Sequence, residues 1–429
     1  MIPKRAPTPS RRPRAARPLG LVLAAALLAP WSAAAATADP APSAPPEAEI
    51  ERLRSLGYAG FDSASASSSG DGVVLHDAAR SYPGYDLYTN PRLCSAVLID
   101  AAGHERHRWS AKRCGKWFHA TLLDSGVLVV PATDSAAGET ADDDLASRHL
   151  LALGWSGEVL WDRPLAVHHD VAPTPSGELV TLLVANRAAG DIDAGTPLRD
   201  NLVARLTAQG EVVDRHSLYA ALRGAGVLEL GGVAKRRAGA IDLLHANAVQ
   251  WLADGPDLGQ PAPARHRPHV LVTIRHQDLV ALLRWDTGEI VWSWGRGELM
   301  GPHDATLLPS GHVLVFDNGL GRGWSRVVEL DPRARRIVWE YRSDPPDRFF
   351  TLSRGSSQRL PNGNTLIAES DRGHAFEVTA SGERVWEFWN PARNERGERS
   401  SIVRMRRIEP ALVDRLLGRP APLGAAPAP

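Results

Sequence analysis

The sequence predicts an all-β protein, a six-bladed β-propeller, from two repeated patterns and from the lack of long helical periodicity. The first pattern is a turn glycine followed by alternating residues and a tryptophan. Its clearest copies are SGEVLW (156–161), TGEIVW (287–292) and SGERVW (381–386), and its weaker copies are AGHERHRW (102–109), QGEVVD (209–214) and ARRIVW (334–339). Six copies at intervals of roughly fifty residues are typical of propeller blades. A two-sheet β architecture is the runner-up, but it does not explain the sixfold spacing.

The second pattern marks a tight turn between two short strands and therefore fixes the phase of each repeat. Its copies are LDSGVLVV (123–130), TPSGELVTL (174–182), LPSGHVLVF (308–316) and LPNGNTLIA (360–368). In the fourth repeat, which lacks the short turn, HANAVQWL (245–252) matches the same strand. The residue eight positions before the turn glycine is then equivalent in successive repeats.

Histidine recurs at this equivalent position. The residues found there, in chain order, are Phe118 (with His119 beside it), His169, His245, His303 and Gly355. Because the last copy carries glycine, the blade fold does not require histidine at this point.

Composition divides the chain into four predicted segments. These are a signal peptide or membrane anchor (1–38), a linker with a short helix (39–72), the propeller (73–395) and a partly disordered C-terminal extension (396–429). The first segment has several arginines, then the apolar run LGLVLAAALLA, then small residues that end in Ala36-Thr37-Ala38. This order is typical of a cleavable signal peptide, and a single membrane anchor is the alternative. Both interpretations predict an exported protein of the periplasm or cell envelope.

The charge balance and the cysteines indicate which partners and which cellular compartment to expect. The 49 Lys and Arg residues balance 49 Asp and Glu residues, so we expect no nucleic-acid partner. Cys94 and Cys114 are the two cysteines of the chain, and export makes a disulfide between them plausible.

Equivalent positions on successive blades lie at similar height and converge on the central axis. We therefore expect His169, His245 and His303 to meet at one mouth of the channel. Arg275 follows the strand HVLVTI (269–274) and is in phase with Asn318. Imidazoles and a guanidinium around one cavity suit a tetrahedral oxyanion such as sulfate or phosphate.

Other interpretations of these side chains stay open at this point. Each histidine can be a hydrogen-bonded structural residue. A three-histidine metal site is a further alternative, although Arg275 beside a dication is unfavourable. Asp170 and Asp304 each follow a histidine, and each can either orient an imidazole or cap a turn.

Several ordered segments resemble the bacterial arylsulfate sulfotransferase family. They are HHD (168–170), HAN (245–247), IRHQD (274–278), PHDATLLPSGHVLVFDNG (302–319) and RLPNGNTLIAE (359–369). The likeness covers about residues 75–390. It implies an exported six-bladed propeller that transfers a sulfuryl group from an aryl sulfate to a phenol, without a nucleotide donor.

The resemblance also implies roles for single residues. His303 is similar to the histidine that becomes sulfated, and His245 and Arg275 match residues that line the site. The remaining family histidine falls on the HHD pair, where repeat phase favours His169 as catalytic. That leaves His168, together with Asn318, as predicted substrate-binding residues. No metal or organic cofactor is expected; the implied partners are a phenolic sulfate donor and a phenol acceptor.

Two rival classes remain on the sequence alone. WDTGEIVW (285–292) is similar to the tryptophan signature of quinoprotein propellers, which predicts an oxidoreductase. A non-catalytic propeller of the cell envelope, acting as a scaffold or ligand-binding module, is the other rival. The first requires a quinone cofactor, and the second predicts that His303 is dispensable.

Overall fold

The computed structural model describes residues 61–62, 70–111, 114–134, 145–189, 192–230, 235–237, 239–258 and 265–418. The predicted signal segment and the helix expected over 47–56 lie outside these residues. Among the described residues, no helix is both long and apolar enough to span a membrane.

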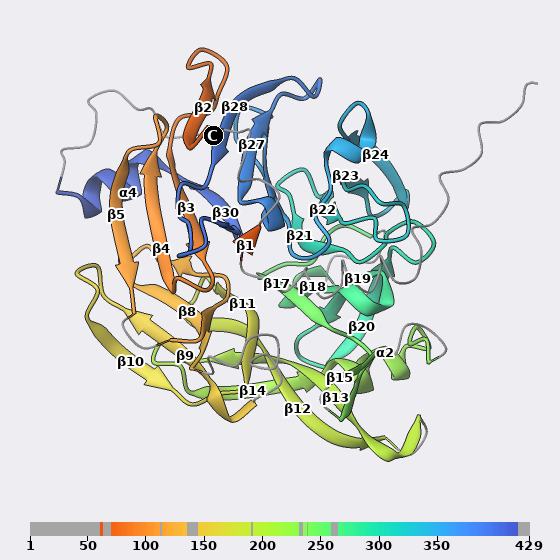
Figure 1. Ribbon diagram of the computed structural model, residues 1–429. Helices are drawn as coiled ribbons and strands as arrows, with labels where there is room; N and C mark the ends of the chain where they lie inside the picture. The colour runs from red at the N-terminus through yellow and green to blue at the C-terminus, as the bar shows by residue number, and fades with distance from the viewer. Residues whose placement is uncertain are drawn as a thin grey trace, which may run out of the picture. The chain divides into compact units, whose positions relative to one another are not determined.

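Six antiparallel sheets form a ring around a central channel (Figure 1), which confirms the predicted propeller. We number them blades 1 to 6 and give their strands from the channel outward. Blade 1 consists of β30 (Met405–Ile408), β3 (Tyr85–Asn90), β4 (Ser95–Asp100) and β5 (Glu105–Ser110). Blade 2 consists of β6 (Lys116–Trp117) and β7 (Thr121–Leu122), then β8 (Leu128–Thr133), β9 (Arg148–Leu153) and β10 (Val159–Arg163). Blade 3 consists of β11 (Val167–Pro173), β12 (Leu179–Ala189), β13 (Asp193–Leu206) and β14 (Val212–Ser217), with β15 (Lys235–Arg237) and β16 (Ala240–Asp242) added beside β13.

The remaining blades follow the same plan. Blade 4 consists of β17 (Ala246–Leu252), β18 (His269–Ile274), β19 (Leu279–Arg284) and β20 (Glu289–Trp294). Blade 5 consists of β21 (His303–Leu307), β22 (Val313–Asp317), β23 (Arg326–Asp331) and β24 (Arg336–Tyr341). Blade 6 consists of β25 (Ser356–Arg359), β26 (Thr365–Glu369), β27 (His374–Val378), β28 (Arg384–Trp389) and β2 (Gly72–His76).

Short elements connect the blades or cover their ends. The α-helices within the described residues are α2 (Leu218–Gly224) and α4 (Pro410–Leu416), and β1 (Phe61–Asp62) pairs with β29 (Arg399–Ser400). Single 3-10 turns are η3 (Leu145–Ser147), η4 (Arg275–Gln277), η5 (Pro346–Arg348) and η6 (Ser370–Arg372).

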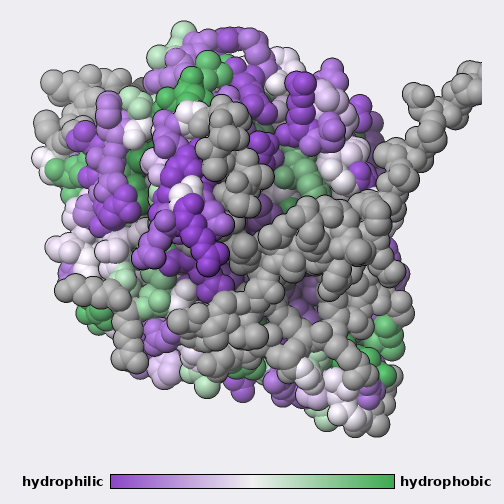
Figure 2. Space-filling model, in the orientation of Figure 1, coloured by the Kyte–Doolittle hydropathy of each residue, from purple (hydrophilic) through white to green (hydrophobic). Residues whose placement is uncertain are grey.

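Burial explains the strand composition. The second strands β8, β18, β22 and β26 are buried along their whole length and carry runs of β-branched and apolar residues. The outer strands β5, β10 and β14 mix polar residues with partly exposed apolar ones, because one side faces solvent. On the face drawn in Figure 2, hydrophobic residues occur as small separate groups among hydrophilic ones.

Four of the five tryptophans in the first pattern join neighbouring blades. In these four the indole Nε1–H donates to a backbone carbonyl in a turn of the next blade. The pairs are Trp109 with Gly154 (3.1 Å), Trp292 with Pro332 (3.2 Å), Trp339 with Ala380 (2.9 Å) and Trp386 with Ala101 (2.9 Å). Because Trp386 is in blade 6 and Ala101 in blade 1, the last of these bonds crosses the closure of the ring.

The C-terminal boundary expected at residue 395 needs correction. Strand β30 pairs with β3 and forms the innermost strand of blade 1. A closed ring leaves no exposed sheet edge when a strand from one end of the domain completes the blade at the other end. The propeller therefore continues to at least Ile408.

The expected disulfide is present. Cys94 and Cys114 are bonded, with their Cα atoms 6.3 Å apart. The bond ties the turn between β3 and β4 to the segment that leads into blade 2, so it fixes part of the first blade interface.

We expect Trp386→Phe to lower the free energy of unfolding by about 1–2 kcal/mol, because it removes one hydrogen bond and leaves the Ala101 carbonyl unpaired. Urea unfolding followed by circular dichroism measures the change. Trp324→Phe is the control, since that ring packs against Arg322 and Arg342 at the surface of blade 5. Equal loss in both variants would contradict a special role for the bond across the closure.

Candidate functional site

The inner strands of blades 3 to 6 have a strained backbone near their starts, at one mouth of the channel. His169, His245, Asp304 and Arg354 have φ values of 62°, 48°, 54° and 59°, in the left-handed region that non-glycine residues seldom adopt. The register of β11, β17 and β21 against the next strand shifts at the same places, as in a β-bulge. Bulges and strained residues of this kind re-aim side chains and collect at functional sites.

Three of the predicted histidines lie together in one recess. The His169 ring is 4.8 Å from the His168 ring and 5.0 Å from the His245 ring, measured between centroids. The recess is narrow, with a cavity volume of about 20 Å³, and Phe118, Arg148, Arg199 and Asn201 also line it. The edge of the Phe118 ring faces His169 at 5.5 Å. Imidazole, guanidinium and aromatic groups therefore share one small space.

His303 lies in a second part of the same mouth and has a defined tautomer. Asn318 Nδ2 donates to the carbonyls of Thr351 and Arg354, both at 2.8 Å, so its Oδ1 is left as an acceptor. His303 Nδ1 is 2.6 Å from that oxygen and 3.0 Å from the Gly301 carbonyl, so Nδ1 carries the proton. Nε2 therefore bears the lone pair, and it accepts the backbone N–H of Arg354 at 3.2 Å.

Asn318 itself does not suit the substrate-binding role expected from the sequence. It is fully buried, and both ends of its amide are bonded to protein groups. Its geometry is that of a positioning residue behind His303.

Burial keeps His303, His168 and His169 neutral. The pKa of His303 is lowered to about 3, chiefly by burial and also by the charges of Arg275 and Arg354, against the opposing hydrogen bond to Asn318. Burial likewise holds the pKa values of His168 and His169 well below the ordinary range. A neutral imidazole with its lone pair on Nε2 is the nucleophilic form.

Arg275 links the two parts of the site. Its Nη1 donates to His276 Nε2 at 3.1 Å, and the His276 ring stacks on His245 with centroids 4.6 Å apart. Its Nη2 donates to the Leu352 carbonyl at 3.3 Å, and its Nε is buried without a hydrogen-bond partner. Its backbone N–H donates to the His245 carbonyl. The guanidinium is thus held between the His245 and His303 regions.

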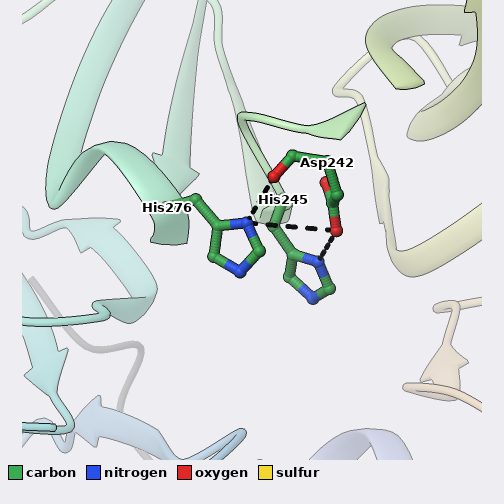
Figure 3. Close-up of side chains that lie close together, drawn as sticks. All are labelled: Asp242, His245 and His276. Atoms are coloured by element: carbon green, nitrogen blue, oxygen red, sulfur yellow. Dashed lines mark hydrogen bonds and ion pairs between the residues drawn. The ribbon is translucent and has the colours of Figure 1, made fainter. Parts of the chain in front are cut away.

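Asp242 anchors this arrangement, as Figure 3 shows. Its carboxylate is 2.6 Å from His245 Nδ1, and its backbone carbonyl accepts from His276 Nδ1 at 2.8 Å. Both contacts place the proton of each ring on Nδ1. His245 and His276 are therefore oriented by the same residue.

Asp242, His245 and His276 are also the one group among the described residues with ligand atoms close enough to hold a metal ion, all within 4.8 Å. The hydrogen bonds do not fit that use. A guanidinium can only donate, so Arg275 makes His276 Nε2 an acceptor and leaves the proton on Nδ1. The nitrogen that faces Asp242 is then a donor and not a metal ligand.

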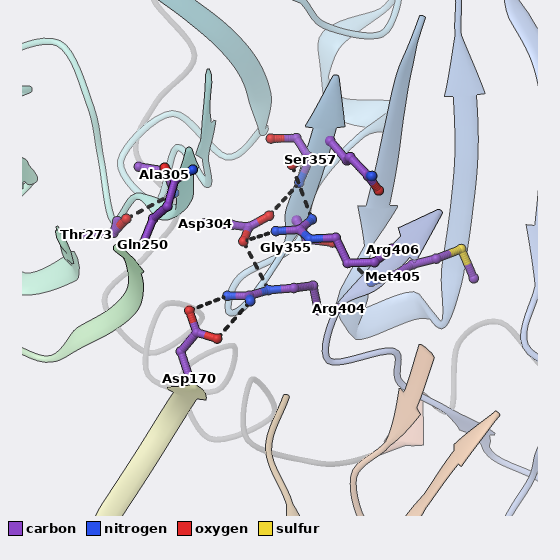
Figure 4. A network of polar contacts seen from close by, with 12 residues as sticks. Asp170, Gln250, Thr273, Asp304, Ala305, Gly355, Ser357, Arg404, Met405 and Arg406 are labelled. Carbon is purple, nitrogen blue, oxygen red and sulfur yellow. Dashed lines mark hydrogen bonds and ion pairs between the residues drawn. The ribbon is translucent and has the colours of Figure 1, made fainter. Parts of the chain in front are cut away.

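The sequence left two roles open for Asp170 and Asp304, orienting an imidazole or capping a turn. In the structure both carboxylates instead bind arginines. The Asp170 carboxylate binds Arg404 Nη1 and Nη2 at 2.8 and 3.0 Å, and Asp304 binds Arg404 Nε at 3.0 Å and Arg406 Nη2 at 2.6 Å (Figure 4). Each carboxylate also accepts a backbone N–H from the next blade, from Val249 and Ser357 respectively. They face a channel cavity of about 210 Å³, and their contacts among the described residues include no imidazole.

Sequence reasoning missed three residues of the mouth: Asp242, His276 and Arg354. Asp242 and His276 lie next to predicted residues, three before His245 and one after Arg275, and that proximity was the available signal. No signal in the sequence pointed to Arg354, because it lies one residue before the equivalent position at Gly355.

The fold and the mouth together define a six-bladed propeller with a histidine and arginine site at one end of its channel. A family model described as Arylsulfotransferase (ASST) matches residues 150–391, more than half of the chain. The chain therefore belongs to the arylsulfotransferase family, and membership supports a transferase function of that general type.

Two solved structures are similar to the chain at low sequence identity. A protein of unknown function from Bacteroides caccae has 12% identity and a TM-score of 0.48, over 76% of this chain and 98% of that one. Virginiamycin B lyase from Staphylococcus aureus has 14% identity and a TM-score of 0.37, over 65% and 72%. At these scores the likenesses carry no argument about function. No curated protein matches the chain.

Acid should destabilise the protein through these histidines. Between pH 6.5 and 3 the unfolded chain binds the proton that folded His303 does not, so stability falls as pH falls. From pH 7 to pH 5, we expect His303→Gln to lose about 2 kcal/mol less unfolding free energy than the unchanged protein. Urea unfolding at both pH values measures this, and identical losses would contradict it.

Proposed function

We propose that the protein transfers a sulfuryl group from an aryl sulfate to a phenol through an N-sulfated His303. The observation that carries this proposal is the state of His303, which is buried and neutral, with Nδ1–H held by Asn318 and the lone pair on Nε2. A nucleophile of this kind forms a covalent intermediate and divides one transfer into two easier steps.

In the first step, Nε2 attacks the sulfur, the sulfur–oxygen bond to the aryl group breaks, and a phenolate leaves and takes up a proton. In the second step, the oxygen of another phenol attacks the sulfur. The bond from sulfur to Nε2 breaks, and that phenol gives up its proton, so the two half-reactions balance. We assign to neutral His169 the uptake of the proton from the attacking phenol in the second step. The phenolate released in the first step takes its proton from water, and His169 returns its proton to water.

Charge stabilisation falls to Arg275 and His245. A guanidinium matches the geometry of sulfuryl oxygens, and the Arg275 guanidinium is held between the two parts of the mouth. The Asp242 carboxylate beside Nδ1 favours a protonated His245, which can then donate from Nε2 to a sulfuryl oxygen. We place the phenol against Phe118 and His169 at the opening of the recess, and His168 lines the same recess.

We also propose that the protein acts after export, in the periplasm or cell envelope. The bond between Cys94 and Cys114 supports this location, because disulfides persist in oxidising compartments.

The central test uses purified protein, 4-nitrophenyl sulfate and a second phenol. We expect nitrophenol release that rises with the second phenol, and an SO3 adduct on the peptide that contains His303. His303→Ala should reduce turnover by at least about 1,000-fold, since it removes the nucleophile. The control is His104→Ala, whose side chain is 75% exposed on blade 1. Normal turnover in His303→Ala, or no adduct during turnover, would contradict the proposal.

Asp242→Asn tests how His245 works. An asparagine removes the charge that favours protonated His245, so we expect kcat/KM to fall by about 100- to 1,000-fold. The alkaline limb of the rate profile should move to lower pH, because less His245 is protonated. Asp162→Asn is the matched control, since Asp162 binds His149 Nδ1 at 2.7 Å on the outside of blade 2. An unshifted pH profile would mean that Asp242 has a structural role alone.

A further inference from the structure

The segment 351–355, which leads into blade 6, forms one wall around His303. The Arg354 N–H donates to His303 Nε2 at 3.2 Å, and the Arg354 carbonyl accepts from Asn318 Nδ2 at 2.8 Å. Asn318 therefore positions both the imidazole and the peptide that faces its lone pair. The segment is further held by Ser353, whose backbone N–H and hydroxyl both bind Asp371.

The backbone of this segment is strained where it meets the histidine. Arg354 has a φ of 59°, in the left-handed region that is unfavourable for a non-glycine residue. The next residue is Gly355, with a φ of 101°. Strain that the surrounding hydrogen bonds maintain at a functional mouth is a reason to look for a function of the residue itself.

The Arg354 side chain is not fully accounted for by its protein contacts. It is 12% exposed, and its Nη1 is 3.0 Å from Ser401 Oγ and 3.5 Å from Asp371 Oδ1. Its Nη2 is buried and has no hydrogen-bond partner among the described residues. A buried guanidinium N–H that lacks an acceptor is unfavourable, so an arriving oxyanion that accepts from it is bound more tightly. The positive charges of Arg354 and Arg275 both lower the pKa of His303.

We propose that Arg354 is a second anion-binding residue of the site, which holds the sulfuryl oxygens through its backbone N–H and its guanidinium together with Arg275. This inference rests on the proposed function, since it places the oxyanion at His303 Nε2. The lone pair that now accepts the Arg354 N–H is the one that bonds to sulfur. When that bond forms, the N–H loses this acceptor and an oxygen on the sulfur takes its place. Arg354 makes and breaks no covalent bond.

Two substitutions separate the parts of this residue. Arg354→Ala keeps the backbone N–H and the same strain at the β-carbon but removes the guanidinium. Arg354→Lys keeps a positive charge and most of the bulk, and it serves as the second variant if alanine lowers folding. The matched control is Arg372→Ala, an arginine of the same blade that pairs with Glu369.

The readouts are binding of inorganic sulfate by titration calorimetry and turnover of 4-nitrophenyl sulfate. We expect Arg354→Ala to weaken sulfate binding at least tenfold and to lower kcat/KM about 100-fold or more, with Arg354→Lys between it and the unchanged protein. Added methylguanidinium should restore part of the activity of Arg354→Ala, which loss of a purely structural contact would not allow.

The outcomes distinguish this inference from the proposed function. Normal sulfate affinity and normal kcat/KM in a folded Arg354→Ala protein overturn the role of Arg354 and leave the sulfotransferase proposal standing. Sulfate binding that depends on Arg354, without any turnover of aryl sulfates, supports the anion site and overturns the reaction. Absence of sulfate binding in the unchanged protein overturns the inference as well.

Discussion

The ion pairs of Arg404 are the constraint on which the mouth of the channel depends. One guanidinium binds Asp170 of blade 3 and Asp304 of blade 5, and all three side chains are almost entirely buried. Burial alone lowers the pKa of Arg404, but the two carboxylates outweigh it and raise that pKa. Removing one partner of such a network leaves an uncompensated buried charge, at a cost of about 3–5 kcal/mol. Because Asp170 follows His169 and Asp304 adjoins His303, the network fixes the height of both histidines. Arg404 directly precedes β30, the strand that completes blade 1 and closes the ring. The same short segment therefore closes the propeller and holds Asp170 and Asp304 in place.

The histidines of the mouth differ through their neighbours. His303, His168 and His169 have buried cationic neighbours that reinforce the effect of burial, and their pKa values are low. His245 instead has a buried carboxylate 2.6 Å from Nδ1. Groups whose environments favour opposite protonation states are the usual basis for dividing acid, base and nucleophile roles. The mouth therefore provides a neutral nucleophile in one part and a potential cation in the other, with Arg275 between them.

The sequence predicted the fold and the shared height of the histidines because both follow from the repeat. The turn glycines and tryptophans recur with the blades, so counting from them places His169, His245 and His303 at one mouth. The contribution of the C-terminus could not be predicted in this way, since β30 completes blade 1 without carrying either repeated pattern. Asp242 was missed for a similar reason. It ends β16, an addition to blade 3 that has no counterpart in other blades.

The glycine in the sixth repeat has a more specific reason than sequence counting suggested. Gly355 shows that a blade does not need histidine at this position, but the space around Gly355 is too small for a side chain. A β-carbon at Gly355 would overlap the ring of Phe316, the residue of β22 that pairs with His303 across the sheet. Any larger residue would push the start of blade 6 away from blade 5, and with it the Arg354 N–H from His303 Nε2. Glycine is thus what lets the neighbouring peptide approach the imidazole, and blade 6 meets the site through the residue before the repeat position. Counting along the repeat identifies residues at equivalent positions of the blades. Arg354 lies one residue before its equivalent position, so only the backbone structure shows that its N–H meets His303.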